Sequence, residues 1–268
     1  MVHSLQGLKE GYHRQSSYDL QPCWLSRTSW LWRTRQPGER NQIQGLRLFA
    51  DIRQIPDYKH LHDAGYHIVC YDLRNHGRSG PNFGAACGQA PFVTYGIYES
   101  RDVVGSVQYV RNRFPDFEIG LYSRCMGANS TIKAFQKFPG EMEAVKCLLA
   151  LQPVSIRTFV KTGAEKAGLD VTKACAQVDD GIFNKMGFHL DDFSPQLAAH
   201  AVTVPTFVLT VRKDSTIDAP RDLQEIYDAL GAKVKKIDWI EDTTVRFDGY
   251  SYLGRNPDAM LRWFSDHL

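Results

Sequence analysis

Residues 118–127 decide how this sequence is interpreted, and they read Glu118-Ile119-Gly120-Leu121-Tyr122-Ser123-Arg124-Cys125-Met126-Gly127. The run from Glu118 to Tyr122 predicts a strand, and Thr131 to Phe138 predicts a helix that leaves the turn between them. A nucleophile on a tight strand-to-helix turn has a strained backbone, which leaves room only for small residues two positions to either side. Ser123 and Gly127 meet this requirement around Cys125. The stretch therefore predicts a turn that presents Cys125.

A rival interpretation makes Ser123 the presented residue. Leu121 and Cys125 would then flank it, and Leu121 would crowd the turn, so Cys125 fits the pattern better. A cysteine at the start of a helix is favoured as the reactive thiolate by the positive end of the helix dipole. The backbone N–H of Met126 would then be one oxyanion donor. The plainer alternative is that Cys125 is a small buried residue behind a structural turn.

Helix-like and strand-like segments alternate from about Asp57 onward, which predicts a mostly parallel central sheet flanked by helices. The expected strands are 66–71, 118–122, 144–151, 204–211 and 234–240, and the expected helices are 58–64, 98–114, 131–138, 222–230 and 257–267. About fifty residues between Ser155 and Pro205 are too long for a bare connection, so 156–203 is expected to form a helical cap. Residues 1–45 show no sustained period and stay unassigned. With no linker or repeat, 1–268 is expected to be a single domain.

Composition bounds the classes of partner that the chain can have. The net charge of +2 over 268 residues gives no broad field for nucleic acid or an anionic membrane, so a small-molecule substrate is expected. The six cysteines have no paired metal-ligand spacing, which predicts free thiols in a reducing compartment and neither a metal nor a cofactor. No apolar run is long enough for a membrane helix and no signal peptide is evident, so the cytoplasm is the expected location. Oligomeric state is not indicated.

Two further motifs stand in order around the cysteine turn. Gly65-Tyr66, a strand, and then Asp72-Leu73-Arg74-Asn75-His76-Gly77-Arg78-Ser79 precede it, and the strand 204–211 followed by Arg212-Lys213-Asp214 comes after it. Together with the turn, these passages resemble the α/β-hydrolase superfamily over roughly Asp57 to Leu268. The resemblance implies the α/β-hydrolase fold with a helical cap insertion, in which Cys125 is at the nucleophile elbow and Asp214 is the orienting carboxylate. A cysteine nucleophile on this fold is similar to the dienelactone hydrolases.

The catalytic histidine that the resemblance implies is missing from its expected place in the sequence. Relatives place it in the loop after the final strand, where this chain reads Glu241-Asp242-Thr243-Thr244-Val245-Arg246-Phe247-Asp248-Gly249-Tyr250. Asp248 and Tyr250 are alternative proton donors or acceptors there, and Arg246 could stabilise a thiolate or bind an anionic substrate. Arg124 could likewise stabilise a thiolate or bind an anionic substrate. His189 could contact the substrate from the cap. Instead of orienting a catalytic group, Asp214 could be a helix N-cap or an ordinary loop aspartate. Asp218 would then be the fallback candidate for the orienting carboxylate.

The sequence also lacks the usual second oxyanion donor of the resemblance, because no His-Gly turn follows the possible strand Leu46 to Asp51. Three functions stay open. The first is an enzyme that attacks an ester, thioester or lactone carbonyl through Cys125, that is, an esterase or thioesterase. The second is an inactive binding or scaffold protein that kept the fold. The third is a lyase or cyclase, because this fold hosts many chemistries.

Overall fold

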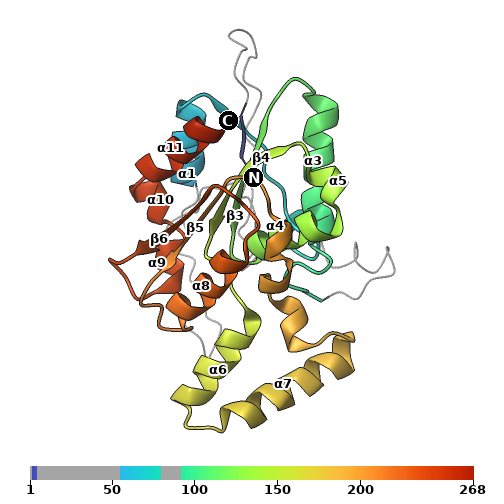
Figure 1. Cartoon of the computed structure of the whole chain (residues 1–268), viewed down its shortest axis with the longest axis vertical. Helices are drawn as coiled ribbons and strands as arrows, with labels where there is room; N and C mark the ends of the chain where they lie inside the picture. Colours follow the sequence, from blue (N-terminus) through green and yellow to red (C-terminus); the bar gives the residue numbers. More distant parts are fainter. Residues whose placement is uncertain (1, 5–54, 80–91) are drawn as a thin grey trace, which may run out of the picture.

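The computed structural model describes residues 2–4, 55–79 and 92–268, and within these ranges six strands form one sheet (Figure 1). The strand order is β2-β1-β3-β4-β5-β6. The strands are β1 Val2–Ser4, β2 Tyr66–Ile68, β3 Ile119–Arg124, β4 Val145–Leu151, β5 Thr206–Val211 and β6 Lys235–Ile240. Strands β3 to β6 run parallel, whereas β1 pairs antiparallel with both β2 and β3. The expected mostly parallel sheet is confirmed.

Helices cover both faces of this sheet. The larger helices are α1 Ile55–Asp63, α3 Ser100–Arg113, α4 Met126–Lys137, α6 Ile156–Lys166, α7 Val171–Met186, α8 Ala219–Ala229 and α11 Asp258–His267. Short turns of helix are α5 Pro139–Met142, α9 Arg246–Gly249, α10 Tyr252–Arg255, η1 Gly77–Ser79, η2 Leu190–Phe193 and η3 Gln196–Ala201. No helix in the described ranges is long and apolar enough to cross a bilayer.

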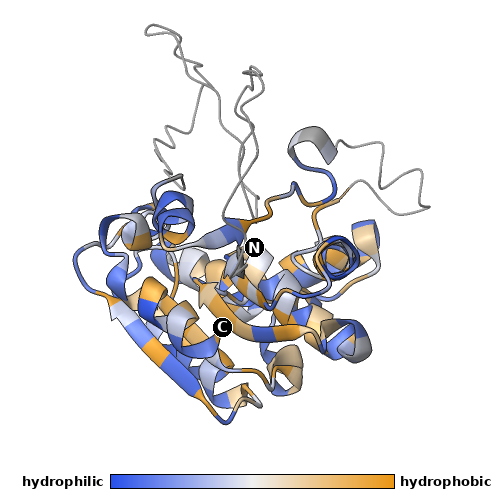
Figure 2. Ribbon diagram, turned by 90° about the horizontal axis from the view of Figure 1, so that it is seen from above, coloured by the Kyte–Doolittle hydropathy of each residue, from blue (hydrophilic) through white to orange (hydrophobic). Residues whose placement is uncertain are grey.

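Alternation along the strands sorts the core into two layers, because successive side chains of a strand point to opposite faces. In β4, Leu148 and Ala150 pack with α3, α4 and α8, while Leu149 and Leu151 pack with α1, α10 and α11. The apolar strands in the middle and the hydrophilic outer sides of the helices are visible in Figure 2. Both faces of the sheet are therefore buried, which is the usual environment of parallel strands.

The segment 156–201 stands apart from this layered body. It holds α6, α7, η2 and η3, and Figure 1 shows α6 and α7 extending beyond the end of the sheet where β3 leads into α4. Lys133 in α4 ties the segment down, because its buried ammonium donates to the backbone oxygens of Asp192 and Ser194 at 2.7 and 2.8 Å. The helices of this segment thus lie beside the carboxyl ends of the parallel strands.

Most element bounds fall within a few residues of those expected, but two regions differ. Strand β2 ends at Ile68 rather than Tyr71, because the chain turns away toward the Asp72 loop. Helix α4 starts at Met126, directly after the turn, and not at Thr131. The possible strand Leu46 to Asp51 lies outside the described residues, as does nearly all of the unassigned segment 1–45.

Replacing Leu149 by alanine tests the core. Leu149 is fully buried in central strand β4. The substitution leaves a cavity and is expected to lower the free energy of unfolding by ~2–5 kcal/mol. Urea denaturation measures the change, with Leu197→Ala as the control because the Leu197 side chain is 70% exposed. Equal stability of the two variants would contradict the burial described.

Candidate active site

Cys125 occupies a sharp turn between the end of β3 at Arg124 and the start of α4 at Met126. Its backbone angles are φ 48° and ψ −120°, a conformation that non-glycine residues rarely adopt and that costs ~1–3 kcal/mol. The Cys125 N–H donates to the Leu151 oxygen at 2.8 Å, which anchors the turn to β4. The side chain is half-buried at the end of the sheet. Strain of this kind is retained when a turn has to present one side chain.

Ser123 is not presented by this turn. Its side chain is 1% exposed and its hydroxyl is hydrogen-bonded to the Thr131 hydroxyl of α4 at 2.8 Å. The serine therefore fastens the strand to the following helix. Met126 is the first residue of α4, where backbone N–H groups have no partner within the helix. Its N–H is available beside Cys125 for an oxyanion. The possible strand Leu46 to Asp51, after which the sequence lacks the His-Gly turn of a second donor, lies outside the described residues.

Asp214 follows β5 and is completely buried at its side chain. It accepts hydrogen bonds from the Thr216 N–H at 2.8 Å, from the Thr216 hydroxyl at 2.6 Å and from Arg246 Nη1 at 2.9 Å. The charge of this buried carboxylate is thus matched by a buried guanidinium. Asp218, the fallback acid, instead caps α8 by accepting from the Arg221 N–H.

Arg246 is the partner of Asp214 in the loop after β6. It is 3% exposed, and its Nη2 donates to the Gln152 oxygen at 2.7 Å, while Gln152 Nε2 donates back to the Arg246 oxygen at 2.8 Å. Burial alone would lower the pKa of Arg246, but the neighbouring Tyr250, Cys125 and Asp214 groups outweigh it and raise that pKa. Arg246 is therefore a permanent positive charge close to the Cys125 sulfur.

Gly249 allows the loop after β6, which carries Arg246, to lie close against the ends of β4 and β5. A Cβ on Gly249 would lie 2.6 Å from Gln152 Nε2 and 2.6 Å from Val211 Cγ2, far inside van der Waals contact. Any larger residue at this position would push α9 away from the ends of β4 and β5. The position of Arg246 and of the residue after the glycine, Tyr250, depends on that contact.

Tyr250 is a buried neighbour of Arg246 on the side of the Asp214–Arg246 pair that faces the cluster around Cys125. It is 7% exposed and packs in the same apolar cluster as Cys125, and the Arg246 guanidinium carbon lies 6.0 Å from its ring centroid. Burial, followed by the charge of a Cys125 thiolate, raises the pKa of Tyr250, and Arg246 only partly opposes this. The phenol is consequently a protonated hydrogen-bond donor at neutral pH.

Tyr95 is a further neighbour of Cys125. Burial, the Cys125 charge and the Glu99 charge raise the pKa of Tyr95. Its ring contacts Phe193 of η2 edge-on, with ring centroids 5.9 Å apart, so it connects the cysteine to the segment 156–201. Nothing in the sequence singled out Tyr95, because it lies in a loop without a recognisable period.

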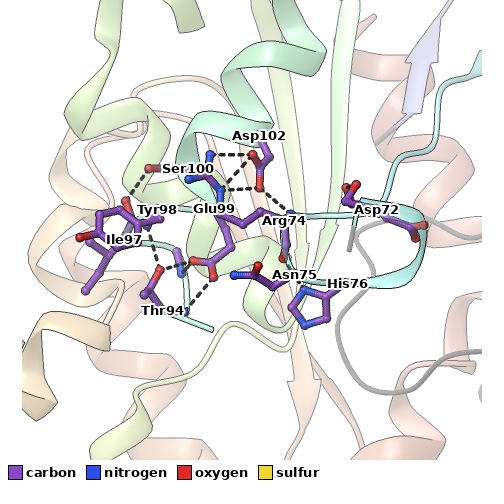
Figure 3. A network of polar contacts seen from close by, with 12 residues as sticks. Asp72, Arg74, Asn75, His76, Thr94, Ile97, Tyr98, Glu99, Ser100 and Asp102 are labelled. Carbon is purple, nitrogen blue, oxygen red and sulfur yellow. Dashed lines mark hydrogen bonds and ion pairs between the residues drawn. The ribbon is translucent and has the colours of Figure 1, made fainter. Parts of the chain in front are cut away.

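Glu99 fixes the loop that carries Tyr95 (Figure 3). Its buried carboxylate accepts from the Thr94 N–H at 2.8 Å, from the Thr94 hydroxyl at 2.6 Å and from the Gly96 N–H at 2.8 Å. Gly96 has φ +109°, and a Cβ there would lie 2.9 Å from the Ser130 nitrogen of α4. The loop is therefore held against the helix that begins at the cysteine turn.

The Asp72 to Ser79 passage supports the same loop rather than contributing to the site. Figure 3 shows Arg74 directed at Asp102 of α3, with Nη2 to Oδ1 at 2.8 Å and the Arg74 N–H to Oδ2 at 2.9 Å. Asn75 Nδ2 donates to the Phe92 oxygen at 3.2 Å. The ring of His76 contacts the Arg74 oxygen through Nδ1 at 2.7 Å, within its own turn.

Three of the sequence-predicted site residues point elsewhere. Arg124 forms a buried ion pair with Asp57 of α1 and donates to the Tyr122 hydroxyl at 2.8 Å; burial lowers its pKa to about 9. His189 is exposed on the segment 156–201 and pairs with Asp179 through Nδ1 at 2.9 Å, which raises its pKa. Asp248 is exposed and accepts from the Thr243 hydroxyl at 2.9 Å. The structure brings Cys125, Met126, Asp214 and Arg246 together, but not these three.

A cavity of about 350 Å³ lies between the start of α6 and the start of α8. Asp222 lines it with a side chain that is largely buried, and its Oδ2 accepts from the Ser155 N–H at 2.9 Å. Burial raises the pKa of Asp222 to about 7, well above its ordinary value of 3.8. The folded protein therefore holds this proton more tightly than the unfolded chain does.

Stability is consequently expected to depend on pH through Asp222. The contribution of its proton is fully present below pH 3.8 and is lost as the pH rises through about 7. Relative to Asp222→Asn, which does not titrate, the wild-type free energy of unfolding should fall by ~2–4 kcal/mol between pH 4 and pH 8. Urea denaturation across this range measures it, with Asp228→Asn of the same helix as the exposed control. Parallel curves for wild type and Asp222→Asn would rule the effect out.

Comparisons with known proteins agree with this architecture. The esterase Pf2001 of Pyrococcus furiosus is similar, with a TM-score of 0.56 and 18% identity over 82% of this chain and 78% of the esterase. A second crystal form of that esterase gives a TM-score of 0.55 at 16% identity, covering 81% of this chain and 75% of the other. Rv0554 of Mycobacterium tuberculosis gives 0.50 at 16% identity, covering 80% and 84%. No family model and no curated protein sequence matches this chain. The mostly parallel sheet, the helices on both faces and these likenesses show that the chain has the α/β-hydrolase fold.

Proposed function

We propose that this protein is an enzyme that attacks the carbonyl carbon of an ester, thioester or lactone through Cys125. The observation that carries the proposal is Cys125 on a strained strand-to-helix turn, near the buried Asp214–Arg246 ion pair. Buried ionisable groups around a half-buried thiol are costly to maintain, and such arrangements concentrate at functional sites. A thiol that served only to fill space would need neither the strained backbone nor the buried guanidinium.

In this proposal Cys125 attacks as the thiolate, in a setting that presents positive charge to it. The N-terminus of α4 and the Arg246 guanidinium both present positive charge to Cys125. The thiolate attacks the carbonyl carbon, and the oxygen that becomes negative is stabilised by the Met126 N–H. Collapse expels the leaving group and leaves the acyl group on Cys125. Water then adds to the acyl carbon and releases the acid and the thiolate.

In this proposal the segment 156–201 acts as a cap that shapes the substrate site. Phe159 of α6 lies against Arg246, whose guanidinium carbon is 5.6 Å from the ring centroid. Val154 and Ile217 form a small apolar cluster, and both Cys125 and Phe159 pack on it. The side of the sulfur that faces this cluster is therefore apolar, which suits a small, uncharged acyl group. Cytoplasmic location and a small-molecule substrate remain part of this proposal.

The proposal is tested by alkylating Cys125 and by asking whether a bound ester protects Cys125 from alkylation. Iodoacetamide should abolish cleavage of 4-nitrophenyl butyrate and add one carboxamidomethyl group at Cys125, and the ester should slow this labelling by occupying the site. Cys175→Ala serves as the control, since Cys175 lies in α7. Full activity of protein that is completely alkylated at Cys125 would overturn the proposed function.

A further inference from the structure

The cavity between α6 and α8 is not part of the turn that presents Cys125. Neither Cys125 nor Arg246 is among its lining residues, so a ligand in it does not depend on the proposed function. Its volume of about 350 Å³ is near the lower end of the range for small-molecule sites. We infer that this cavity binds a small primary amine in its ammonium form, with the buried Asp222 carboxylate as the counter-charge.

The buried part of the lining carries oxygen acceptors. It consists of Thr158 of α6, Ser194 and Asp222 of α8, and Asp222 is only 7% exposed. Asp222 Oδ2 accepts from the Ser155 N–H at 2.9 Å, but no described residue donates to Asp222 Oδ1. The Thr158 hydroxyl has no hydrogen-bond partner in the described ranges either. The Ser194 hydroxyl accepts a single bond, from the Gln196 N–H at 3.3 Å. Three oxygens can therefore accept from a ligand.

The charged side chains around the cavity leave an excess of negative charge. Two of the positive side chains already have a negative partner, because Arg157 pairs with Asp191 and Arg221 pairs with Glu225. The charged lining residues that form no ion pair with a described residue are Lys161 on the positive side and Glu165, Asp218 and Asp222 on the negative side. The lining therefore favours a cation over an anion.

An ammonium group matches both the acceptors and the charge. It carries one positive charge and three N–H donors, as the side chain of lysine does. A carboxylate that is buried without a countercharge is costly, and burial raises the pKa of Asp222 to about 7. A bound ammonium supplies the missing positive charge and stabilises the ionised carboxylate. An uncharged ligand of the same size would leave this carboxylate uncompensated.

Isothermal titration calorimetry of the full chain at pH 8 tests the inference with n-butylammonium chloride. Saturable binding of one equivalent is expected with a Kd of ~1–10 mM, which is realistic for a ligand of about five heavy atoms. 1-Butanol has the same carbon chain without the charge and should not saturate in this range. Absence of saturable binding of n-butylammonium, or equal binding of 1-butanol, would overturn the inference.

Two substitutions assign the binding to this cavity. Asp222→Asn keeps the size of the side chain but removes its charge, so Kd for n-butylammonium should rise by ~10-fold or more. Thr158→Val removes one acceptor and should raise Kd by ~3–10-fold. The controls are Asp228→Asn in α8 and Thr172→Val in α7, both at exposed positions. Circular dichroism verifies folding, and wild-type affinity in either folded cavity variant would contradict the site.

The pH dependence of binding gives a further check on Asp222. The charged groups around it are Arg157, Lys161 and Glu165 of α6, Asp191 of η2, Asp218, Arg221 and Glu225 of α8, and Arg246 of α9, with no histidine among them. With a pKa of about 7, the ionised fraction of Asp222 rises ~10-fold between pH 6 and pH 8. The affinity for n-butylammonium should rise by the same factor in wild type and stay constant in Asp222→Asn. A wild-type affinity that does not change with pH would overturn the assignment to Asp222.

Discussion

Replacing Cys125 by serine is expected to abolish turnover as completely as replacing it by alanine. A serine hydroxyl needs a base to remove its proton, and the ionisable neighbours of this position on the loop after β6 are the positive Arg246 and the protonated Tyr250. Both variants should lose at least ~10³-fold in kcat/KM for 4-nitrophenyl butyrate, since removal of a nucleophile costs that much or more in related acyl-transfer enzymes.

Cys175→Ala is the control for both variants, and each protein's melting temperature shows whether folding is intact. Substantial activity of Cys125→Ser would show that a base does reach the turn, which contradicts the thiolate mechanism. Unchanged activity of Cys125→Ala would remove the cysteine from the reaction altogether.

Replacing Arg246 by methionine is expected to lower the free energy of unfolding by ~3–5 kcal/mol. The substitution keeps most of the side chain's length but leaves the Asp214 carboxylate buried without its countercharge. Urea denaturation at pH 7 measures the loss. The variant should also lose turnover, because the positive charge beside Cys125 disappears with the guanidinium.

Two comparisons make the Arg246 result specific. Arg221→Met removes an exposed ion pair with Glu225 and should cost less than ~1 kcal/mol. The double variant Asp214→Asn with Arg246→Met removes both charges, so it should recover part of the lost stability. A loss in Arg246→Met no larger than that of Arg221→Met would contradict the buried pair.

The cysteine turn and the parallel strands could be predicted because their signals are local. Small residues two positions either side of Cys125 are a steric requirement of the turn, and the apolar runs of β4 and β5 are long enough to show their buried character. Strand β1 could not be predicted. It has three residues, too few for a period, and its place between β2 and β3 depends on partners more than sixty residues away.

The loop after β6 illustrates where sequence reasoning stops. Arg246 and Asp248 are both candidates from the sequence, and they lie two residues apart on α9, which puts them on different sides of a short helix. The close contact of Gly249 with β4 and β5 turns Arg246 inward and leaves Asp248 exposed. Arg124 was expected to stabilise a thiolate or to bind an anionic substrate, but its side chain points to Asp57 and Tyr122.

The most direct measurement of the central claim is the site of the acyl group on protein quenched in acid during turnover of 4-nitrophenyl butyrate. Peptide mass spectrometry should find one butyryl group, and fragmentation should place it on Cys125. A butyryl group on Ser123 or on any other residue, or turnover without any acylated protein in a rapid quench, would contradict the claim that Cys125 is the nucleophile.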